Sequence, residues 1–173
     1  MKNNNIILIG MPGAGKSTMG VILAKVMGYR FLDADLLIQE QEKRLLREII
    51  EQEGQEGFIE VENRVNASIC TENTIIATGG SVIYGAEAMK HLGSIGTVIY
   101  IRLSYQTVSE RLGNIRQRGV VLKEGQTLYS LYQERCPLYQ KYAHLTIDAE
   151  GMDTEQLMET ILEQLNSAGL YGK

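Results

Sequence analysis

The chain alternates short apolar runs with longer segments whose apolar residues recur every three or four positions. Short runs bounded by glycine or polar residues are typical of buried strands, and the longer periodic segments are typical of helices. We expect strands at residues 5–9, 29–32, 74–77, 98–101 and 145–147. We expect helices at residues 18–27, about 36–70 with a break near Gly54 and Gly57, 104–112, 127–142 and 153–166. This alternation predicts an α/β fold in which a parallel sheet is covered by helices on both faces.

The loop between the first expected strand and the first expected helix carries the clearest chemical signal. Residues 10–17 read Gly-Met-Pro-Gly-Ala-Gly-Lys-Ser, which fits the phosphate-binding pattern G-x-x-x-x-G-K-S/T. The order of strand, glycine loop and helix is the one that the pattern requires, which argues against a glycine-rich turn that binds nothing. Glycines let backbone N–H groups turn inward around phosphate oxygens, and a helix N-terminus favours anions. The expected nucleotide-binding residues of this loop are Gly13, Ala14, Gly15, Lys16, Ser17 and Thr18.

Acidic residues follow the second expected strand. Ligands of parallel α/β sheets bind beyond the carboxyl ends of the strands, and Asp33 and Asp35 lie at such an end. One carboxylate could hold Mg²⁺ together with the Ser17 hydroxyl, while the other accepts a hydrogen bond from a substrate hydroxyl. The alternative is that Asp35 only caps a helix that begins at Leu36. The position next to a phosphate loop favours the functional interpretation.

Two further segments are candidates for ligand contacts. Gly79 and Gly80 follow the third expected strand, where glycines allow close approach of a ligand, although a plain turn has the same composition. Residues 111–123 contain Arg111, Arg116, Arg118 and Lys123 and no acidic residue. Such a stretch could close over phosphates and stabilise a transferring phosphoryl group, or it could be a solvated loop. Arg135, shortly before a proline, could bind a carboxylate or lie on the surface.

Composition and charge limit the number of domains, the cellular location and the classes of partner that we expect. A length of 173 residues suits a single domain over residues 1–173, and no apolar stretch approaches the roughly 20 residues that span a bilayer. The net charge of −4 argues against general binding to nucleic acid. The N-terminus does not resemble a signal peptide, and the two cysteines form no metal-binding pattern. We therefore expect a cytoplasmic monomer that acts on a small molecule, without a membrane or nucleic-acid partner.

The motifs and their order resemble those of the shikimate kinase family, which are P-loop enzymes similar to nucleoside monophosphate kinases. The resemblance covers residues 5–165 and includes the phosphate loop and a D-x-D pair at Asp33 and Asp35. The family's T-G-G-G stretch corresponds to T-G-G-S at 78–81, its R-P-L-L lid segment corresponds to R-G-V-V at 118–121, and its R-x-P-L-Y motif is matched at 135–139. The implied fold is a three-layer αβα sandwich around a five-stranded parallel sheet with a mobile lid. The implied substrate-binding helical segment is about 34–62, and the implied lid is about 112–124.

The resemblance implies ATP-dependent phosphorylation of shikimate to shikimate 3-phosphate, with Mg²⁺, as a step of aromatic amino acid biosynthesis. The implied catalytic residues are Lys16, Asp35 and Arg118, and the implied metal ligands are Ser17 and Asp33. Arg111 and Arg118 join the loop residues in binding the nucleotide, with Arg111 stacked on adenine. The implied acceptor site consists of Asp35, Gly79, Gly80 and Arg135.

The chain departs from the family where an arginine of the motif F-R-x-x-E helps to bind the acceptor carboxylate. Ile59 stands at the arginine position, whereas the matching glutamate, Glu62, is retained. The loss of one charge-assisted hydrogen bond should cost about 1.5–3 kcal/mol. Arg64 is a poor substitute, because five helical residues rotate it about 140° from position 59. Ser81 for glycine, and Gly119, Val120 and Val121 for the lid's P-L-L, are milder departures.

The departure at Ile59 leaves two alternatives open. One is a kinase of the same fold that phosphorylates another small hydroxylated metabolite. The other is a nucleotide-binding regulatory module without catalysis. The presence of Asp35 and Arg118 argues against the module, because a protein that only binds nucleotide needs neither side chain.

Overall fold

The computed structural model describes residues 4–113, 120 and 122–170. Its sheet has five strands in the order β2-β3-β1-β4-β5, and every neighbouring pair is parallel. The strands are β1 (Asn5–Ile9), β2 (Arg30–Asp33), β3 (Thr74–Ala77), β4 (Gly96–Arg102) and β5 (Leu145–Asp148). The expected α/β fold with a five-stranded parallel sheet is confirmed.

The central strands are buried on both faces, which explains why they are continuous apolar runs rather than alternating ones. All residues of β1 and β3 are buried, whereas the edge strands β2 and β5 are partly exposed. In the register of the sheet, Ile6 of β1 lies opposite Ile75 of β3 and Thr97 of β4. The centre of the sheet is therefore also the centre of the main hydrophobic core.

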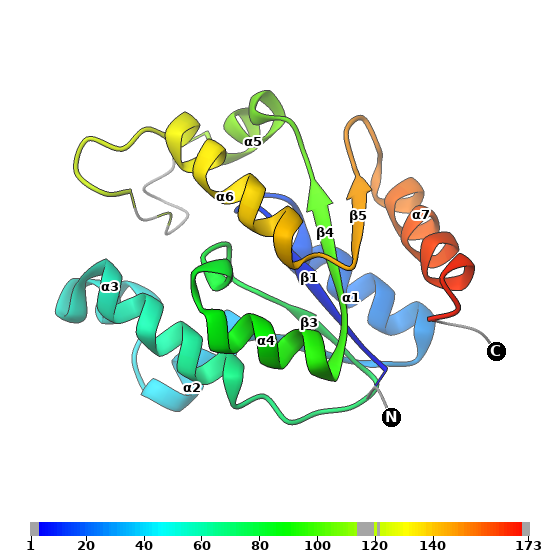
Figure 1. Cartoon of the computed structure of the whole chain (residues 1–173), viewed down its shortest axis with the longest axis horizontal. Coiled ribbons are helices and arrows are strands. Elements are labelled where there is room, and N and C mark those ends of the chain that lie inside the picture. The colour runs from blue at the N-terminus through cyan, green and yellow to red at the C-terminus, as the bar shows by residue number, and fades with distance from the viewer. Residues whose placement is uncertain (1–3, 114–119, 121, 171–173) are drawn as a thin grey trace.

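Helices cover the two faces of the sheet (Figure 1). The first helix, α1 (Lys16–Met27), packs against β2, β3 and the last helix, whereas α4 (Ala86–Ile95) and α6 (Leu128–Tyr142) pack against β4. In Figure 1, α4 and α6 lie in front of the sheet and α1 lies behind it. The helices are α1 (Lys16–Met27), α2 (Ala34–Glu42), α3 (Leu46–Ala67), α4 (Ala86–Ile95), α5 (Tyr105–Leu112), α6 (Leu128–Tyr142) and α7 (Thr154–Ser167), with a short 3₁₀ helix η1 (Val82–Tyr84).

The segment expected as one broken helix over about 36–70 is two helices. Its first helix, α2, begins at Ala34 and ends at Glu42, and α3 continues from Leu46 to Ala67. The expected break at Gly54 is confirmed, because this residue has non-helical angles of φ 73° and ψ −178° inside α3. A second, smaller core holds α2 against α3, and it consists of Ile38, Ile49, Phe58, Val61 and Val65.

One helix was absent from the expected elements. The α4 helix carries three buried residues, Ala88, Met89 and Leu92, whose spacing of one and three positions is a helical signal. The helix has only 10 residues, and Gly85 and Gly96 cap its ends. In the part of the chain that the structure describes, no helix is both long enough and apolar enough to cross a membrane.

Candidate active site

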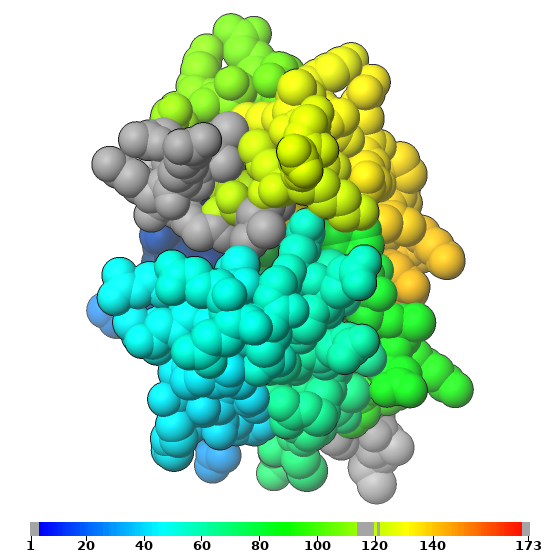
Figure 2. All heavy atoms as spheres, turned by 90° about the vertical axis from the view of Figure 1, so that its left-hand side faces the viewer, coloured from blue at the N-terminus to red at the C-terminus, as the bar shows by residue number. Residues whose placement is uncertain are grey.

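A cavity of about 590 Å³ lies at the carboxyl ends of β1 and β3. Its walls come from the phosphate loop, from the start of α2, from both halves of α3, from the segment after β3 and from α6. Figure 2 shows the opening between α3, in cyan, and the yellow-green residues before α6. The cavity therefore lies where the sequence predicted that the ligands of a parallel sheet would bind.

The phosphate loop has the backbone that its glycines were expected to provide. Gly13 and Gly15 have φ values of 79° and 88°, in the left-handed region that favours glycine. Gly10 passes so close to β4 that a Cβ there would lie 2.7 Å from the Ile101 carbonyl oxygen. Five of the six expected loop residues line the cavity: Gly13, Gly15, Lys16, Ser17 and Thr18. Ala14 does not line it, because its side chain is buried in the core below the loop.

Lys16 is folded back over its own loop. Its Nζ donates hydrogen bonds to the carbonyl oxygens of Gly10 (2.9 Å) and Met11 (3.0 Å). Burial lowers the pKa of Lys16 to about 8, and the nearby Asp35 carboxylate opposes that shift. The side chain therefore places a desolvated ammonium group beside the cavity.

Ser17 and Asp33 meet as the sequence predicted. The Ser17 hydroxyl donates to Asp33 Oδ2 at 2.8 Å, so two oxygen atoms lie side by side at the start of α1. The other carboxylate oxygen of Asp33 accepts hydrogen bonds from the backbone N–H groups of Asp35 (3.0 Å) and Leu36 (3.3 Å). The alternative in which Asp35 caps the helix is therefore wrong, because Asp33 caps α2.

Asp35 is free of the capping role and lines the cavity from the first turn of α2. Burial and the neighbouring Asp33 raise the pKa of its carboxyl group, and the charge of Lys16 opposes them. Gly79 lies against this carboxylate, since a Cβ there would be 2.9 Å from Asp35 Oδ1 and 2.5 Å from Glu62 Oε1. Gly79 thus lets two carboxylates approach the same stretch of backbone.

Glu62 was not among the expected site residues, although the motif comparison had named it. Its side chain is buried, and Ser81 donates a short hydrogen bond to its Oε2. Its Oε1 has no hydrogen-bond partner among the described residues. Burial raises the pKa of Glu62 to about 7, against the hydrogen bond from Ser81, and the charge of Asp35 adds to the increase.

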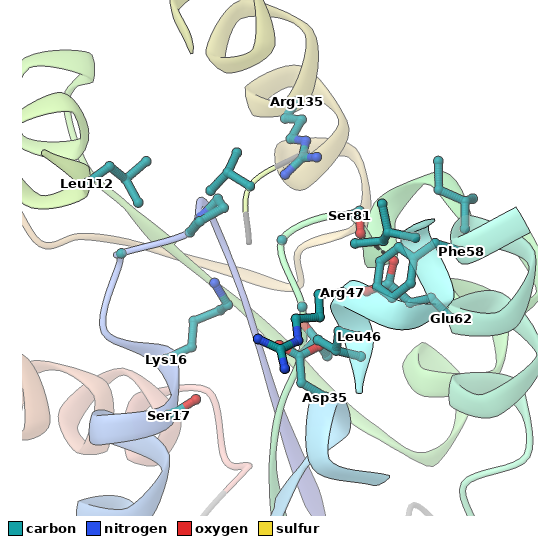
Figure 3. A pocket seen from close by; sticks show the side chains of 18 of the residues that line it. Lys16, Ser17, Asp35, Leu46, Arg47, Phe58, Glu62, Ser81, Leu112 and Arg135 are labelled. Atoms are coloured by element: carbon teal, nitrogen blue, oxygen red, sulfur yellow. Dashed lines mark hydrogen bonds between the residues drawn. The ribbon is translucent and has the colours of Figure 1, made fainter. Parts of the chain in front are cut away.

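Arg135 lies inside the protein, so the alternative of a surface arginine is wrong. It is 3% exposed, and its guanidinium lies 5.5 Å from the centre of the Tyr84 ring. Figure 3 shows it reaching from α6 into the cavity, across from Lys16 and Asp35. Gly80 fits beneath it, because a Cβ there would lie 3.0 Å from Arg135 and 2.8 Å from Pro12. All four expected acceptor residues therefore border one cavity.

The remaining predicted residues are divided between the described and undescribed parts of the chain. Arg111 Nη1 donates to the Gly13 carbonyl oxygen at 3.4 Å, which places the guanidinium beside the phosphate loop. Arg118 and most of the expected lid, residues 114–119 and 121, lie outside the described residues. Arg64 is directed elsewhere, because its guanidinium pairs with Glu42 at 2.7 Å.

Both halves of α3 contribute a wall whose residues were not among the expected site residues, although they lie within the implied substrate-binding segment of about 34–62. The apolar members of this wall are Leu46, Ile50, Phe58 and Ile59, and its polar members are Arg47, Glu51, Gln55 and Glu62. The residues recur at helical spacing on each side of Gly54. Their spacing was visible in the sequence, but the cavity-facing side depends on how α3 packs on α2.

Comparison with known proteins identifies the family. The model of the shikimate kinase family matches residues 12–166. The chain is 33% identical to shikimate kinase of Sulfurihydrogenibium sp., over 93% of this chain and 97% of that one. It is 38% identical to shikimate kinase of Thiobacillus denitrificans, over 95% and 92% of the two chains.

Solved structures agree with the sequence comparisons. Shikimate kinase from Acinetobacter baumannii in complex with shikimate superposes with a TM-score of 0.85 at 32% identity, over 96% of this chain and 95% of that one. Shikimate kinase from Aquifex aeolicus gives a TM-score of 0.80 at 29% identity, over 97% and 99%. The chain therefore belongs to the shikimate kinase family, whose members are ATP-dependent kinases that transfer phosphate to shikimate.

Proposed function

We propose that this chain transfers the γ-phosphate of ATP to a ring hydroxyl of shikimate and forms shikimate 3-phosphate. The observation that carries the proposal is the shared cavity, which brings Lys16 of the phosphate loop, the Asp35 carboxylate and the buried Arg135 guanidinium to one space. Phosphoryl transfer is mainly positioning and charge stabilisation, so these three groups are the chemistry that the reaction needs.

The nucleotide occupies the phosphate-loop side of the cavity in this proposal. Lys16 Nζ exchanges its two loop carbonyls for phosphate oxygens, and Arg111, beside Gly13, lies against adenine. Ser17 and Asp33 fit Mg²⁺, because this ion prefers oxygen ligands and is usually bound through one or two protein groups, phosphates and water. Magnesium, when bound, neutralises charge on the β- and γ-phosphates.

The acceptor occupies the side between Asp35 and Arg135. Asp35 accepts a hydrogen bond from the attacking hydroxyl and takes its proton, a role that its raised pKa supports. Arg135 binds the carboxylate of the acceptor, and Gly79 and Gly80 leave room for its ring. Arg118 is proposed to stabilise the transferring phosphoryl group by its match to the family's lid motif.

The proposed organisation is one domain over residues 1–173, with an acceptor-binding segment at about 34–62 and a lid at about 112–124. The separate small core between α2 and α3 supports the first of these segments. We also propose a monomer in the cytoplasm. The exposed Cys70 thiol, which forms no disulfide, is compatible with a reducing compartment.

A coupled assay of ADP release tests the proposal, with mass spectrometry to identify shikimate 3-phosphate. The Asp35→Asn variant is the specific control, because it keeps the shape of the side chain but removes the base. We expect turnover by the wild type and a loss of at least about 100-fold in kcat for the variant, the scale of general-base catalysis. ADP release that requires no acceptor, or an unaffected variant, would contradict the assignment.

A second candidate function keeps the kinase chemistry and changes the acceptor. Ile59, half-buried in the cavity wall, favours it because isoleucine cannot bind a carboxylate. The same assay over hydroxy acids, sugars and amino alcohols distinguishes the two candidates by kcat/KM. Binding of ATP without phosphorylation of any of these acceptors would indicate a regulatory module.

A further inference from the structure

Arg47 is a cationic residue of the cavity wall, and the proposed reaction gives it no role in binding or catalysis. Among the described residues that line the cavity, the cationic side chains are Lys16, Arg47 and Arg135. Lys16 belongs to the phosphate loop, and Arg135 is buried on the opposite wall. Arg47 lies in the first turn of α3, and Figure 3 shows its side chain extending from that helix into the cavity.

Its neighbouring arginines are engaged in ion pairs, and Arg47 is not. Arg44 pairs with Glu53 at 2.6 Å and with Glu42 at 3.2 Å, and Arg64 pairs with Glu42 at 2.7 Å. In the described ranges, no carboxylate lies within 4.0 Å of the Arg47 guanidinium. Arg47 is exposed to solvent, and its side chain borders a cavity that should bind an anion.

The break at Gly54 explains how Arg47 and Ile59 come to face the same space. In a straight helix, twelve residues separate two positions by about 18 Å along the axis and rotate them by about 120°. Gly54, with φ 73° and ψ −178°, divides α3 between them. Each half then contributes its own stripe to the cavity, Leu46, Arg47 and Ile50 from the first and Phe58, Ile59 and Glu62 from the second.

The charge balance of the cavity indicates which anion Arg47 receives. Asp35, Glu51 and Glu62 line the cavity, so a carboxylate that enters it meets three acidic side chains. The phosphates have Lys16 and the loop N–H groups, whereas the described residues offer the acceptor carboxylate only Arg135 besides Arg47. We propose that Arg47 binds the carboxylate of the acceptor and supplies the second guanidinium that Ile59 lacks. This inference rests on the proposed function, because it takes shikimate as the acceptor.

The test compares Arg47→Ala with wild type on two acceptors, shikimate and its methyl ester, at saturating ATP. We expect the KM for shikimate to rise about 10- to 150-fold in the variant, the cost of one charge-assisted hydrogen bond. The kcat should stay within about threefold, because the carboxylate is held equally in the ground and transition states. The KM for the methyl ester should hardly change, so the preference for the free acid is lost.

Two further variants make the result specific. Arg64→Ala removes an arginine from the same helix that pairs with Glu42 outside the cavity, and it should leave both KM values unchanged. Adding Ile59→Arg to Arg47→Ala should recover at least about tenfold of the lost affinity, because the new guanidinium lies one turn from Glu62. Circular dichroism of every variant confirms that the fold is retained.

The following results would contradict the proposed role of Arg47. A change below twofold in the KM for shikimate shows that Arg47 does not contact the acceptor. An equal loss with both acceptors, or a rise in the KM for ATP, shows that Arg47 contacts phosphate instead. Absence of shikimate turnover by the wild type refutes the proposed function, and the inference with it, whereas turnover that is insensitive to Arg47 refutes the inference alone.

Discussion

Glu62 is a buried carboxyl group whose ionisation affects the stability of the fold. Its pKa is raised to about 7, mainly by burial and further by the charge of Asp35, against the hydrogen bond from Ser81. A carboxyl group with a raised pKa in the folded state stabilises the fold below its unfolded pKa of about 4.3, and this contribution is lost as pH rises through the folded pKa. Glu62 therefore makes the fold less stable above about pH 7 than near pH 4.

The Glu62→Gln variant tests this pH dependence. Glutamine keeps the shape and the hydrogen bond to Ser81 but does not ionise, so the stability of the variant should depend less on pH. Relative to the variant, the wild type should lose about 2–3 kcal/mol of unfolding free energy between pH 4.5 and pH 8. Urea unfolding at several pH values measures the difference. A difference between the two proteins that stays constant with pH would contradict the assignment.

Substitution of Lys16 tests the role of the phosphate loop in turnover. Lys16→Met removes the ammonium group and keeps a side chain of similar length in the same buried position. We expect loss of turnover with an unchanged circular dichroism spectrum, because the phosphates lose their main cation. Lys25→Met is the matched control, since Lys25 lies exposed on the same helix and should retain full activity. Turnover by Lys16→Met at the wild-type rate would exclude the role proposed for this lysine.

At the scale of elements, the sequence predicted the features that are determined by residues adjacent in the sequence. The phosphate loop was predictable because strand, glycines and helix are consecutive, and the break at Gly54 because glycine breaks a helical pattern. Asp33 rather than Asp35 caps α2, because the helix begins at Ala34, two residues before the expected start at Leu36. The burial of Arg135 and the place of Arg47 in the cavity depend on packing between distant segments, which no local pattern contains.

Gly54 gives a prediction for an element as a whole. Alanine at φ 73° and ψ −178° should cost about 1–3 kcal/mol or straighten α3, which would pull its two halves away from the shared cavity. We expect Gly54→Ala to raise the KM for shikimate at least fivefold and the KM for ATP by less than twofold. Gly151→Ala introduces strain at a φ of 71° between β5 and α7, where no cavity residue lies. It should lower stability without changing the KM for shikimate, and an equal effect of both variants would contradict the role of the break.

At the scale of the whole molecule, the protein has two cores of unequal size. The α2–α3 core contains five buried residues and is separate from the main core that surrounds the sheet. Regions with few buried apolar contacts open at a lower free energy than the sheet does. We expect amide hydrogens of α2 and α3 to exchange faster than those of β1 and β3, and to slow when shikimate is added with ADP. Exchange that is uniform across the two cores, or unchanged by shikimate, would contradict this division.

The position of β1 in the middle of the sheet affects the order of events during synthesis. Asn5 Nδ2 donates hydrogen bonds to the carbonyl oxygens of Thr71 and Ile95, which are 66 and 90 residues later in the chain. Gly10, at the start of the phosphate loop, packs against the carbonyl oxygen of Ile101 in β4. The nucleotide loop is thus translated before the segments that support it, and it lacks these supports until β4 has been translated. A nascent chain that ends before residue 96 carries the whole phosphate motif without the strand that holds it in place. We therefore expect nucleotide binding to begin only after β4 has been translated.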